Sequence, residues 1–232
     1  MRKVVPVLVA ALVVLGVAAA ASAEQGQLSL GYWVNDTKVT FPGNLPAQEV
    51  SSPAIVGSGS FVLMPKVAIN GEFALAREVE GKQGSDKFKV QGSQTLVYGS
   101  YQLLEQSGLS VAPAVGFVAA SNNYDWSPST TKYAVSYSGV LVGGVIKIDL
   151  ASGLQGKVIL LYGPKVGITD GFDNSTYTST LTSVAASLSI NVYRNVALEV
   201  GYRGLSQAAK KDNTEKWDRS TTGFFAGASI SF

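Results

Sequence analysis

The chain ends on Phe224-Phe225-Ala226-Gly227-Ala228-Ser229-Ile230-Ser231-Phe232, in which two kinds of side chain alternate. Every second residue counted back from Phe232 is apolar, namely Ile230, Ala228, Ala226 and Phe224. The residues between them are glycine or serine, apart from Phe225. Successive side chains of a β-strand point to opposite faces, so this pattern predicts a strand with one apolar face and one more polar face.

This last strand gives the first indication of a family. A strand that alternates in this way and finishes on an aromatic residue resembles the C-terminal strand of bacterial outer-membrane β-barrels. The resemblance implies that Ile230 and Phe232 belong to an assembly signature. The barrel-assembly machinery is therefore an expected partner, which would act through the C-terminal strand. A protein of this kind needs a secretory signal.

The N-terminal residues have the pattern of a secretory signal peptide. Arg2 and Lys3 give a positive start, residues 4–20 are an apolar run, and Ala21-Ser22-Ala23 is a small-x-small cleavage sequence. We predict a cleaved signal peptide over residues 1–23 and a barrel domain over residues 24–232. An uncleaved membrane helix is the alternative, but the apolar run is short and no positively charged flank follows it.

The composition limits the classes of function. Loss of residues 1–23 removes Arg2 and Lys3 and no acidic residue, so the 18 basic residues fall to 16 and equal the 16 acidic ones. A neutral mature chain gives no electrostatic reason to expect a nucleic-acid partner. The chain has no cysteine, which excludes disulfides and thiolate metal sites. We expect no cofactor and no metal.

The chain also contains no histidine. Imidazole is the base or the ligand in catalytic triads and dyads and in most catalytic zinc sites. The known outer-membrane barrel enzymes (omptin-type proteases, lipid A palmitoyltransferases and deacylases, and the outer-membrane phospholipase) resemble one another in needing a catalytic histidine. The sequence therefore predicts a protein that is not an enzyme and has no catalytic residue.

Turn residues divide the mature chain into short and long connections. Short turns rich in Pro, Gly, Asn or Ser are expected at residues 64–66, 105–108, 151–153 and 193–195. Longer polar loops are expected near residues 35–52, 81–87, 121–131, 168–177 and 207–217. Outer-membrane barrels have short turns on one side and longer loops on the other. These connections join ten strands, with eight as the alternative, and place both termini on the short-turn side.

The fold class that follows is all-β, a closed antiparallel up-and-down transmembrane β-barrel. Apolar side chains alternate with polar or small ones through nearly every strand, and the apolar faces are mostly free of charge in their middles. A soluble β-sandwich also alternates and is the competing interpretation. Leu96 breaks the alternation, and Ile159 and Leu161 blur it in the strand where Lys157 and Lys165 share the expected inner face.

Charged residues on the expected inner faces are the candidate lumen residues. They are Glu72, Lys147, Asp149, Lys157, Glu199 and Arg203. We favour an internal salt-bridge network that fills a narrow lumen, because buried charges must be paired. The functional alternative is that Glu199 and Arg203 gate or line a small pore. Inward glycines leave space for such a pore, namely Gly31, Gly116, Gly143, Gly201 and Gly227.

One internal segment resembles a known family. The stretch Tyr193-Arg194-Asn195-Val196-Ala197-Leu198-Glu199-Val200-Gly201-Tyr202-Arg203 is similar to the penultimate strand of small OmpA/OmpX-type barrels, also described as porin-family proteins. Many of those relatives have eight strands, whereas this chain has turn signals for ten. The resemblance implies an outer-membrane barrel but not one activity, since the family includes anchors, adhesins and conduits.

The function predicted from the sequence is that of a non-enzymatic protein of the bacterial outer membrane, porin-like or structural. Outer-membrane lipid and lipopolysaccharide are its expected partners. Two alternatives stay open: a surface adhesin or ligand-binding barrel that acts through its loops, and a narrow conduit for small solutes. The sequence makes no prediction of the oligomeric state.

Overall fold

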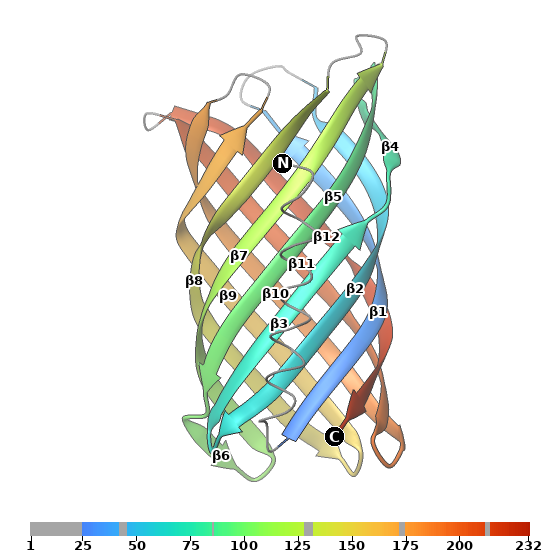
Figure 1. Cartoon of the computed structure of the whole chain (residues 1–232), viewed down its shortest axis with the longest axis vertical. Helices are drawn as coiled ribbons and strands as arrows, with labels where there is room; N and C mark the ends of the chain where they lie inside the picture. The colour runs from blue at the N-terminus through green and yellow to red at the C-terminus, as the bar shows by residue number, and fades with distance from the viewer. Residues whose placement is uncertain (1–24, 42–45, 85, 128–131, 172–174, 212–213) are drawn as a thin grey trace.

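The computed structural model describes residues 25–41, 46–84, 86–127, 132–171, 175–211 and 214–232, which form one antiparallel β-barrel (Figure 1). The predicted signal peptide, residues 1–23, lies outside the described residues. Within the described part of the chain, no helix is long and apolar enough to cross a membrane.

The described residues contain twelve strands, ten of which form the barrel wall, as predicted. They are β1 (Gln25–Thr40), β2 (Gln48–Met64), β3 (Val67–Ala76), β4 (Val79–Gln83), β5 (Asp86–Tyr101), β6 (Leu104–Gln106), β7 (Leu109–Ser127), β8 (Lys132–Ala151), β9 (Leu154–Asp170), β10 (Thr176–Tyr193), β11 (Val196–Lys211) and β12 (Thr214–Ser231). The short β4 follows β3 after a break at Arg77 and Glu78 and pairs with β2 and β5. The short β6 forms a hairpin with β7.

The barrel is closed by its first and last strands. β1 pairs with β12 from Gln27 and Ser231 to Thr40 and Asp218. At the lower end of this seam, the amide of Gly26 donates to the carbonyl of Phe232 at 2.9 Å, and the amide of Phe232 donates back to Gly26 at 2.9 Å. Closure gives each wall strand a partner on both sides, so the backbone is satisfied without water, as a bilayer requires.

The four short turns lie at the end of the barrel that holds Gln25 and the C-terminus, as the turn residues predict (Figure 1). We call it the short-turn end. In the turn between β6 and β7, Ser107 has φ 50° and Gly108 has φ 79°. Positive φ at both central residues is the geometry of a type I′ hairpin, whose twist matches that of the strands it joins.

The opposite end, which we call the loop end, has shorter connections than predicted. Strands continue through much of the expected loops, since β1 reaches Thr40, β7 reaches Ser127 and β11 reaches Lys211. Their polar residues bond across strands instead of ending them: the hydroxyls of Thr37 and Thr221 lie 2.9 Å apart. Outside a bilayer a strand needs hydrogen-bonding partners but no apolar face, so polarity there does not mark a loop.

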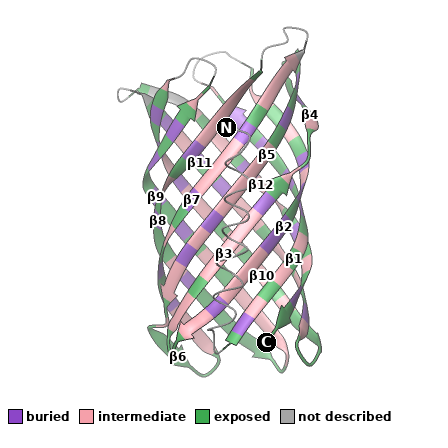
Figure 2. Cartoon of the chain, in the orientation of Figure 1, coloured by how far each residue is buried: buried purple, intermediate pink, exposed green. Residues whose placement is uncertain are grey.

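The outward face carries many large apolar side chains that are exposed, which we call the apolar belt. Figure 2 shows exposed residues recurring along the strands. The belt includes Leu30, Val34, Val115, Phe117, Val140, Leu160, Val184, Ile190, Leu198, Val200 and Phe224. These are outward positions in the predicted alternation. A protein in water would bury most of this surface, whereas hydrocarbon accommodates it. The belt favours the transmembrane barrel over the soluble sandwich.

Charged pairs lie at the loop end, beyond the belt. The Lys38 ammonium lies 3.1 Å from Glu49, and that of Lys87 lies 2.7 Å from Glu80 in the hairpin of β4 and β5. The hydrogen bond from Lys87 lowers the pKa of the Glu80 carboxyl below its usual value. A tilted strand needs roughly 9–11 residues to cross a membrane. β8 has 20 residues, so the barrel wall extends past the bilayer.

A bulge in β9 changes which residues face the lumen. One extra residue, at Pro164 and Lys165, shifts its register against β10. Proline has no amide hydrogen to give to the ladder, which suits a bulge. Beyond it, Val166 and Ile168 are buried and Lys165 is exposed on the outside. The prediction that Lys165 shares the inner face with Lys157 is therefore wrong.

The inside of the barrel is more apolar than predicted. A cluster of buried side chains projects inward from β5 and from β7 to β11. Its most buried members are Val118, Leu141, Leu161, Val166, Ile168, Leu181 and Ala209. Leu96 and Leu161, which disturb the simple alternation, belong to this cluster. Much of the inner face is therefore a packed core, and the prediction of a polar or small inner face is wrong where this cluster lies.

Candidate functional site

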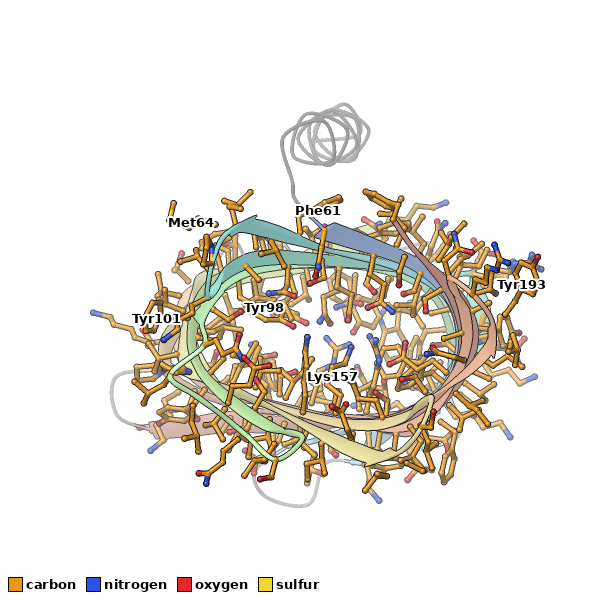
Figure 3. All side chains as sticks on the ribbon, turned by 90° about the horizontal axis from the view of Figure 1, so that it is seen from below. Phe61, Met64, Tyr98, Tyr101, Lys157 and Tyr193 are labelled. Atoms are coloured by element: carbon orange, nitrogen blue, oxygen red, sulfur yellow. The ribbon has the colours of Figure 1, made fainter. Side chains whose placement is uncertain are left out.

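A layer of side chains crosses the lumen near its middle. We call it the septum and define it as Val56 of β2, Glu72 of β3, Tyr98 of β5, Arg203 of β11 and Phe225 of β12. Val56, Tyr98 and Phe225 are 5–8% exposed, which is typical of a protein core. Seen from the short-turn end, the Tyr98 side chain points into the lumen (Figure 3).

Glu72 and Arg203 form the polar part of the septum. A guanidinium Nη1 of Arg203 donates to the Glu72 carboxylate, and the two side chains are 15% and 18% exposed, respectively. In the ring of strands, β2, β1 and β12 separate β3 from β11, so the ion pair connects distant parts of the wall. The Arg203 guanidinium also lies 4.4 Å from the centre of the Phe225 ring. A stacked arginine of this kind neutralises the carboxylate and fills space at once.

Cavities lie on both sides of the septum. The one on the loop-end side, which we call the upper cavity, has a volume of about 70 Å³. Its lining includes Ala54, Ala74 and Leu205. Each lies two residues nearer the loop end than Val56, Glu72 and Arg203 on the same strands. The one on the short-turn side, which we call the lower cavity, has a volume of about 140 Å³. Among the described residues, the two cavities have no lining side chain in common.

The lower cavity contains most of the other predicted lumen charges. Lys66, Lys147, Lys157 and Glu199 line it. The Lys157 ammonium lies 3.7 Å from the Glu199 carboxylate, a long ion pair whose side chains are 32% and 15% exposed. Among its described lining residues, the lower cavity thus has three lysine ammonium groups and one carboxylate, that of Glu199. It opens toward the short-turn end. Figure 3 shows the Lys157 side chain directed into the lumen.

Lys147 and Asp149 do not join a network inside the barrel. Both are exposed near the short-turn end of β8. Asp149 accepts a hydrogen bond of 3.0 Å from the Gln155 amide, and within the described part of the chain Lys147 takes part in no ion pair. Among the six predicted charges the structure therefore has two separate ion pairs, while Lys147 lines the mouth of the lower cavity and Asp149 bonds to Gln155.

The space beside the predicted inward glycines is taken up by neighbouring atoms of the barrel. A Cβ atom at Gly201 would lie 2.5 Å from the Phe225 ring, and one at Gly116 would lie 2.6 Å from the Cβ atom of Tyr98. At Gly143 a Cβ atom would meet the carbonyl oxygen of Leu160 at 1.9 Å. Gly201 thus leaves room for the Phe225 ring inside the barrel, whereas Gly116 and Gly143 allow the neighbouring strand to approach closely within the wall.

The candidate site residues predicted from the sequence do not include the aromatic side chains of the septum. Phe225 is visible as the large residue on the otherwise small face of the last strand, and Trp33 is the corresponding residue in the first strand. The two are register partners and belong to one buried cluster with Val56. A large aromatic at an inward position among glycines and serines is the signal that points to a filled lumen.

The C-terminal residues lie where the alternation places them. Ile230 and Phe232 are 47% and 53% exposed on the outer face. The centres of the Phe232 and Phe61 rings lie 6.3 Å apart. The role of Ile230 and Phe232 in barrel assembly stays a prediction.

Within the described part of the chain, no group of three or more acidic side chains is arranged to hold a metal ion.

Comparison with known proteins bears on the fold. No family model and no curated protein sequence matches the chain. Its structure is similar to OmpT, the outer-membrane protease of Escherichia coli, with a TM-score of 0.53 and 13% identity over 90% of this chain and 96% of that one. It is less similar to Ail, the attachment invasion locus protein of Yersinia pestis, with a TM-score of 0.42 and 11% identity over 90% and 98%. For the translocator domain of the autotransporter NalP from Neisseria meningitidis, the values are 0.46 and 9% over 98% of both chains. At these identities the similarity to OmpT establishes the fold alone: the chain has the fold of an outer-membrane β-barrel.

Proposed function

We propose that the protein is a non-enzymatic β-barrel of the bacterial outer membrane whose lumen is closed by the septum. Its role is then structural rather than that of an open porin. The observation that carries this proposal is the trans-lumen pair of Glu72 and Arg203, packed against the Phe225 ring. A barrel of eight strands is just filled by its side chains, whereas 16–18 strands leave an aqueous channel. Ten strands lie near the filled limit.

The same proposal includes secretion and assembly. Residues 1–23 act as a signal peptide that is removed on export, and the C-terminal strand with Ile230 and Phe232 engages the barrel-assembly machinery. The apolar belt contacts outer-membrane lipid, and the loop end faces lipopolysaccharide. The resemblance of residues 193–203 to small OmpA/OmpX-type barrels supports this placement. Because the chain has no histidine, we propose no catalytic activity, although OmpT, which shares the fold, is a protease.

Single-channel recording tests the closed lumen. Residues 24–232 are refolded in detergent and inserted into a planar bilayer, with insertion verified by protection of the strands from protease. The wild-type protein is expected to give no discrete conductance steps. A variant with both Arg203→Ala and Phe225→Ala removes the two bulkiest parts of the septum and is expected to conduct.

A matched variant makes the recording decisive. Glu49→Ala removes a charge from the exposed loop end and leaves the septum unchanged, so it should stay silent. Reproducible steps from the wild-type protein would contradict a closed lumen and would favour a narrow conduit. A folded double variant that remains silent would show that the septum is not what closes the barrel.

A second candidate function is ligand binding at the loop end. The specific observation in its favour is the length of β7 and β8, which have 19 and 20 residues and extend beyond the apolar belt. Aromatic packing supports this projecting end from within: the Tyr124 and Tyr133 rings stack at 5.1 Å, and the buried Phe88 ring lies 4.9 Å from Trp126. Shortening this projecting end should abolish surface binding and spare refolding if the candidate is right.

A further inference from the structure

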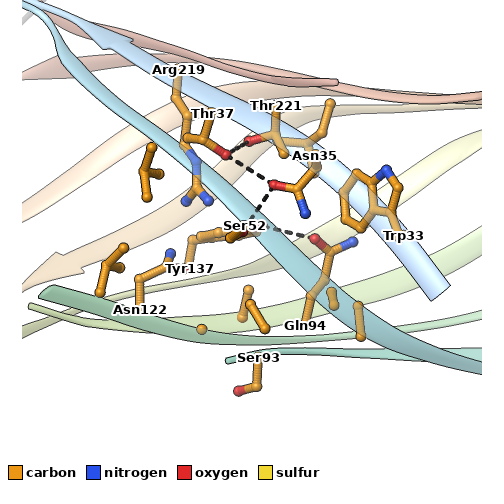
Figure 4. Close-up of a pocket in the computed structure, with 18 of the residues that line it drawn as sticks. Trp33, Asn35, Thr37, Ser52, Ser93, Gln94, Asn122, Tyr137, Arg219 and Thr221 are labelled. Atoms are coloured by element: carbon orange, nitrogen blue, oxygen red, sulfur yellow. Dashed lines mark hydrogen bonds between the residues drawn. The ribbon is translucent and has the colours of Figure 1, made fainter. Parts of the chain in front are cut away.

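The upper cavity lies on the loop-end side of the septum, and its lining includes a cation that forms no ion pair among the described residues. Its lining extends from Trp33, near the septum, to Thr37, Val50 and Arg219, toward the loop end. Arg219 belongs to β12 and is the only charged side chain in this lining among the described residues. Figure 4 shows its guanidinium group directed among the polar side chains of the cavity.

Arg219 is half-buried, and one nitrogen of its guanidinium has no hydrogen-bond partner. Its Nε atom is buried without a hydrogen-bond partner, and it takes part in no ion pair among the described residues. Arg203, which also lies in the lumen, likewise has a buried Nε without a partner, but its guanidinium is paired with Glu72. An anion beside a partly buried charge stabilises it, so a half-buried guanidinium without an ion pair is a candidate anion-binding group.

The neighbouring polar side chains are occupied with one another. The hydroxyls of Thr37 and Thr221 lie 2.9 Å apart, and the Ser52 hydroxyl donates to the Asn35 amide oxygen at 3.2 Å (Figure 4). On the opposite wall, the Tyr137 hydroxyl donates to Gln94 at 3.3 Å. These bonds fix the walls of the cavity, and none of them involves Arg219.

We infer that the upper cavity is a binding site for a small carboxylate, with Arg219 as its anchoring residue. The planar guanidinium fork matches the two oxygens of a carboxylate. Val50, Val90 and Leu205 supply apolar wall on which a short alkyl group packs. Inorganic anions have no apolar part to use this wall, so a short-chain carboxylate fits the lining better than chloride or sulfate.

The volume of the cavity limits the ligand. A cavity of about 150 Å³ holds benzene, and this one has about 70 Å³, which is roughly half as much. A carboxylate of about four or five heavy atoms, such as acetate or propionate, is therefore the expected size. So few atoms make few contacts, and a dissociation constant in roughly the millimolar range is expected.

The test titrates sodium propionate into refolded residues 24–232, labelled with ¹⁵N, at constant ionic strength. The signals followed are the Arg219 Nε–H and the Trp33 indole N–H, which both belong to the cavity lining. Saturable shifts are expected with propionate. Propionamide has nearly the same shape and no charge, and its affinity should be at least tenfold weaker.

Two variants assign the binding to Arg219. Arg219→Gln should weaken propionate binding at least tenfold, and Arg219→Lys should retain part of it. Arg194→Gln is the matched control, because Arg194 lies exposed in the turn between β10 and β11, at the other end of the barrel. It should leave the affinity unchanged.

Several outcomes would overturn the inference. Propionamide binding as tightly as propionate would remove the requirement for an anion, and chloride binding equally well would remove the preference for a carboxylate. Unchanged affinity in a folded Arg219→Gln variant would dismiss the proposed anchor. If that variant does not refold, the comparison of propionate with propionamide on the wild-type protein decides, and shifts that do not saturate would reject the site.

Discussion

Glu72 and Arg203 are 131 residues apart in the sequence and form an ion pair across the lumen of the barrel. Both side chains are largely removed from solvent, at 18% and 15% exposure. The pair connects β3 to β11, which are not neighbours in the sheet, so it ties opposite parts of the wall together. A porin would place such charges around an aqueous path, whereas here they neutralise each other beside Phe225.

Removing one member of this pair should destabilise the barrel strongly. Arg203→Met leaves the Glu72 carboxylate buried without a partner, and a loss of about 3 kcal/mol in the free energy of unfolding is expected. The double variant Glu72→Gln with Arg203→Met should cost less than the sum of the two single variants. Urea titration of the protein refolded in lipid vesicles measures each value.

The exposed pair at the loop end is the control for this cycle. Lys38 and Glu49 are 59% and 65% exposed, and their separate removal should change stability by about 0–1 kcal/mol. An Arg203→Met variant that unfolds at the same urea concentration as Lys38→Met would show that the trans-lumen pair does not hold the wall together.

The contact between Gly201 and Phe225 predicts a sharp difference between two glycines of β11. A Cβ atom at Gly201 would lie 2.5 Å from the Phe225 ring and 2.4 Å from the carbonyl oxygen of Ala186. Gly201→Ala should therefore destabilise the barrel by about 1–3 kcal/mol through overpacking. At Gly204 the nearest atom is Thr222 Cγ2 at 3.7 Å, an ordinary contact.

Gly204→Ala is the matched substitution, and its effect on the urea midpoint should be small. Equal destabilisation by the two alanines would mean that strand glycines matter for a general reason, such as folding rate, and not because the Phe225 ring occupies the space above Gly201.

The apolar belt predicts where β9 tolerates a charge. Leu160 is 51% exposed within the belt, so Leu160→Lys should cost about 2–4 kcal/mol in a bilayer. Thr169 is also exposed and lies on the same strand, near the loop end. Thr169→Lys should be nearly neutral, because its ammonium remains in water. Refolding into vesicles at increasing urea compares the two, and equal costs would contradict the placement of the belt.

The amino-acid sequence predicts the barrel well because several independent signals agree. The alternation that ends at Phe232, the short turns and the apolar outer faces all lead to ten antiparallel strands, and the structure has them. Outward positions such as Leu30 and Val200 could be assigned by counting in steps of two. This works because a strand that contacts lipid on one face has a strict side-chain period.

The lumen is harder to predict because its side chains obey no such rule. Leu161 and Leu181 are apolar and inward, so alternation alone does not separate them from lipid-facing residues. The Pro164 bulge moves Lys165 to the outside, which counting in twos cannot anticipate. The pairing of Glu72 with Arg203 depends on the tilt of ten strands, and neither local pattern nor charge count contains that information.

The terminal Phe232 predicts a difference between assembly in cells and refolding in vitro. Its ring is 53% exposed on the outer face, so Phe232→Ala should still refold in detergent with only a modest loss of stability. If the terminal residue is read by the barrel-assembly machinery, the same variant should accumulate less in the outer membrane. Ser231→Ala, one residue away, is the control, and equal amounts of both variants in the membrane would reject this role.

Thiol accessibility from the two ends of the lumen tests the closed septum most directly. The chain has no cysteine, so single cysteines at Ser52, in the upper cavity, and at Ser189, in the lower cavity, can be labelled without background. Cysteines at Asp86 and Ser152 report which end of the vesicle-inserted barrel faces outward. We predict that a membrane-impermeant thiol reagent reaches Ser52→Cys only from the loop end and Ser189→Cys only from the short-turn end. Labelling of either cysteine from both ends at similar rates would contradict a closed lumen.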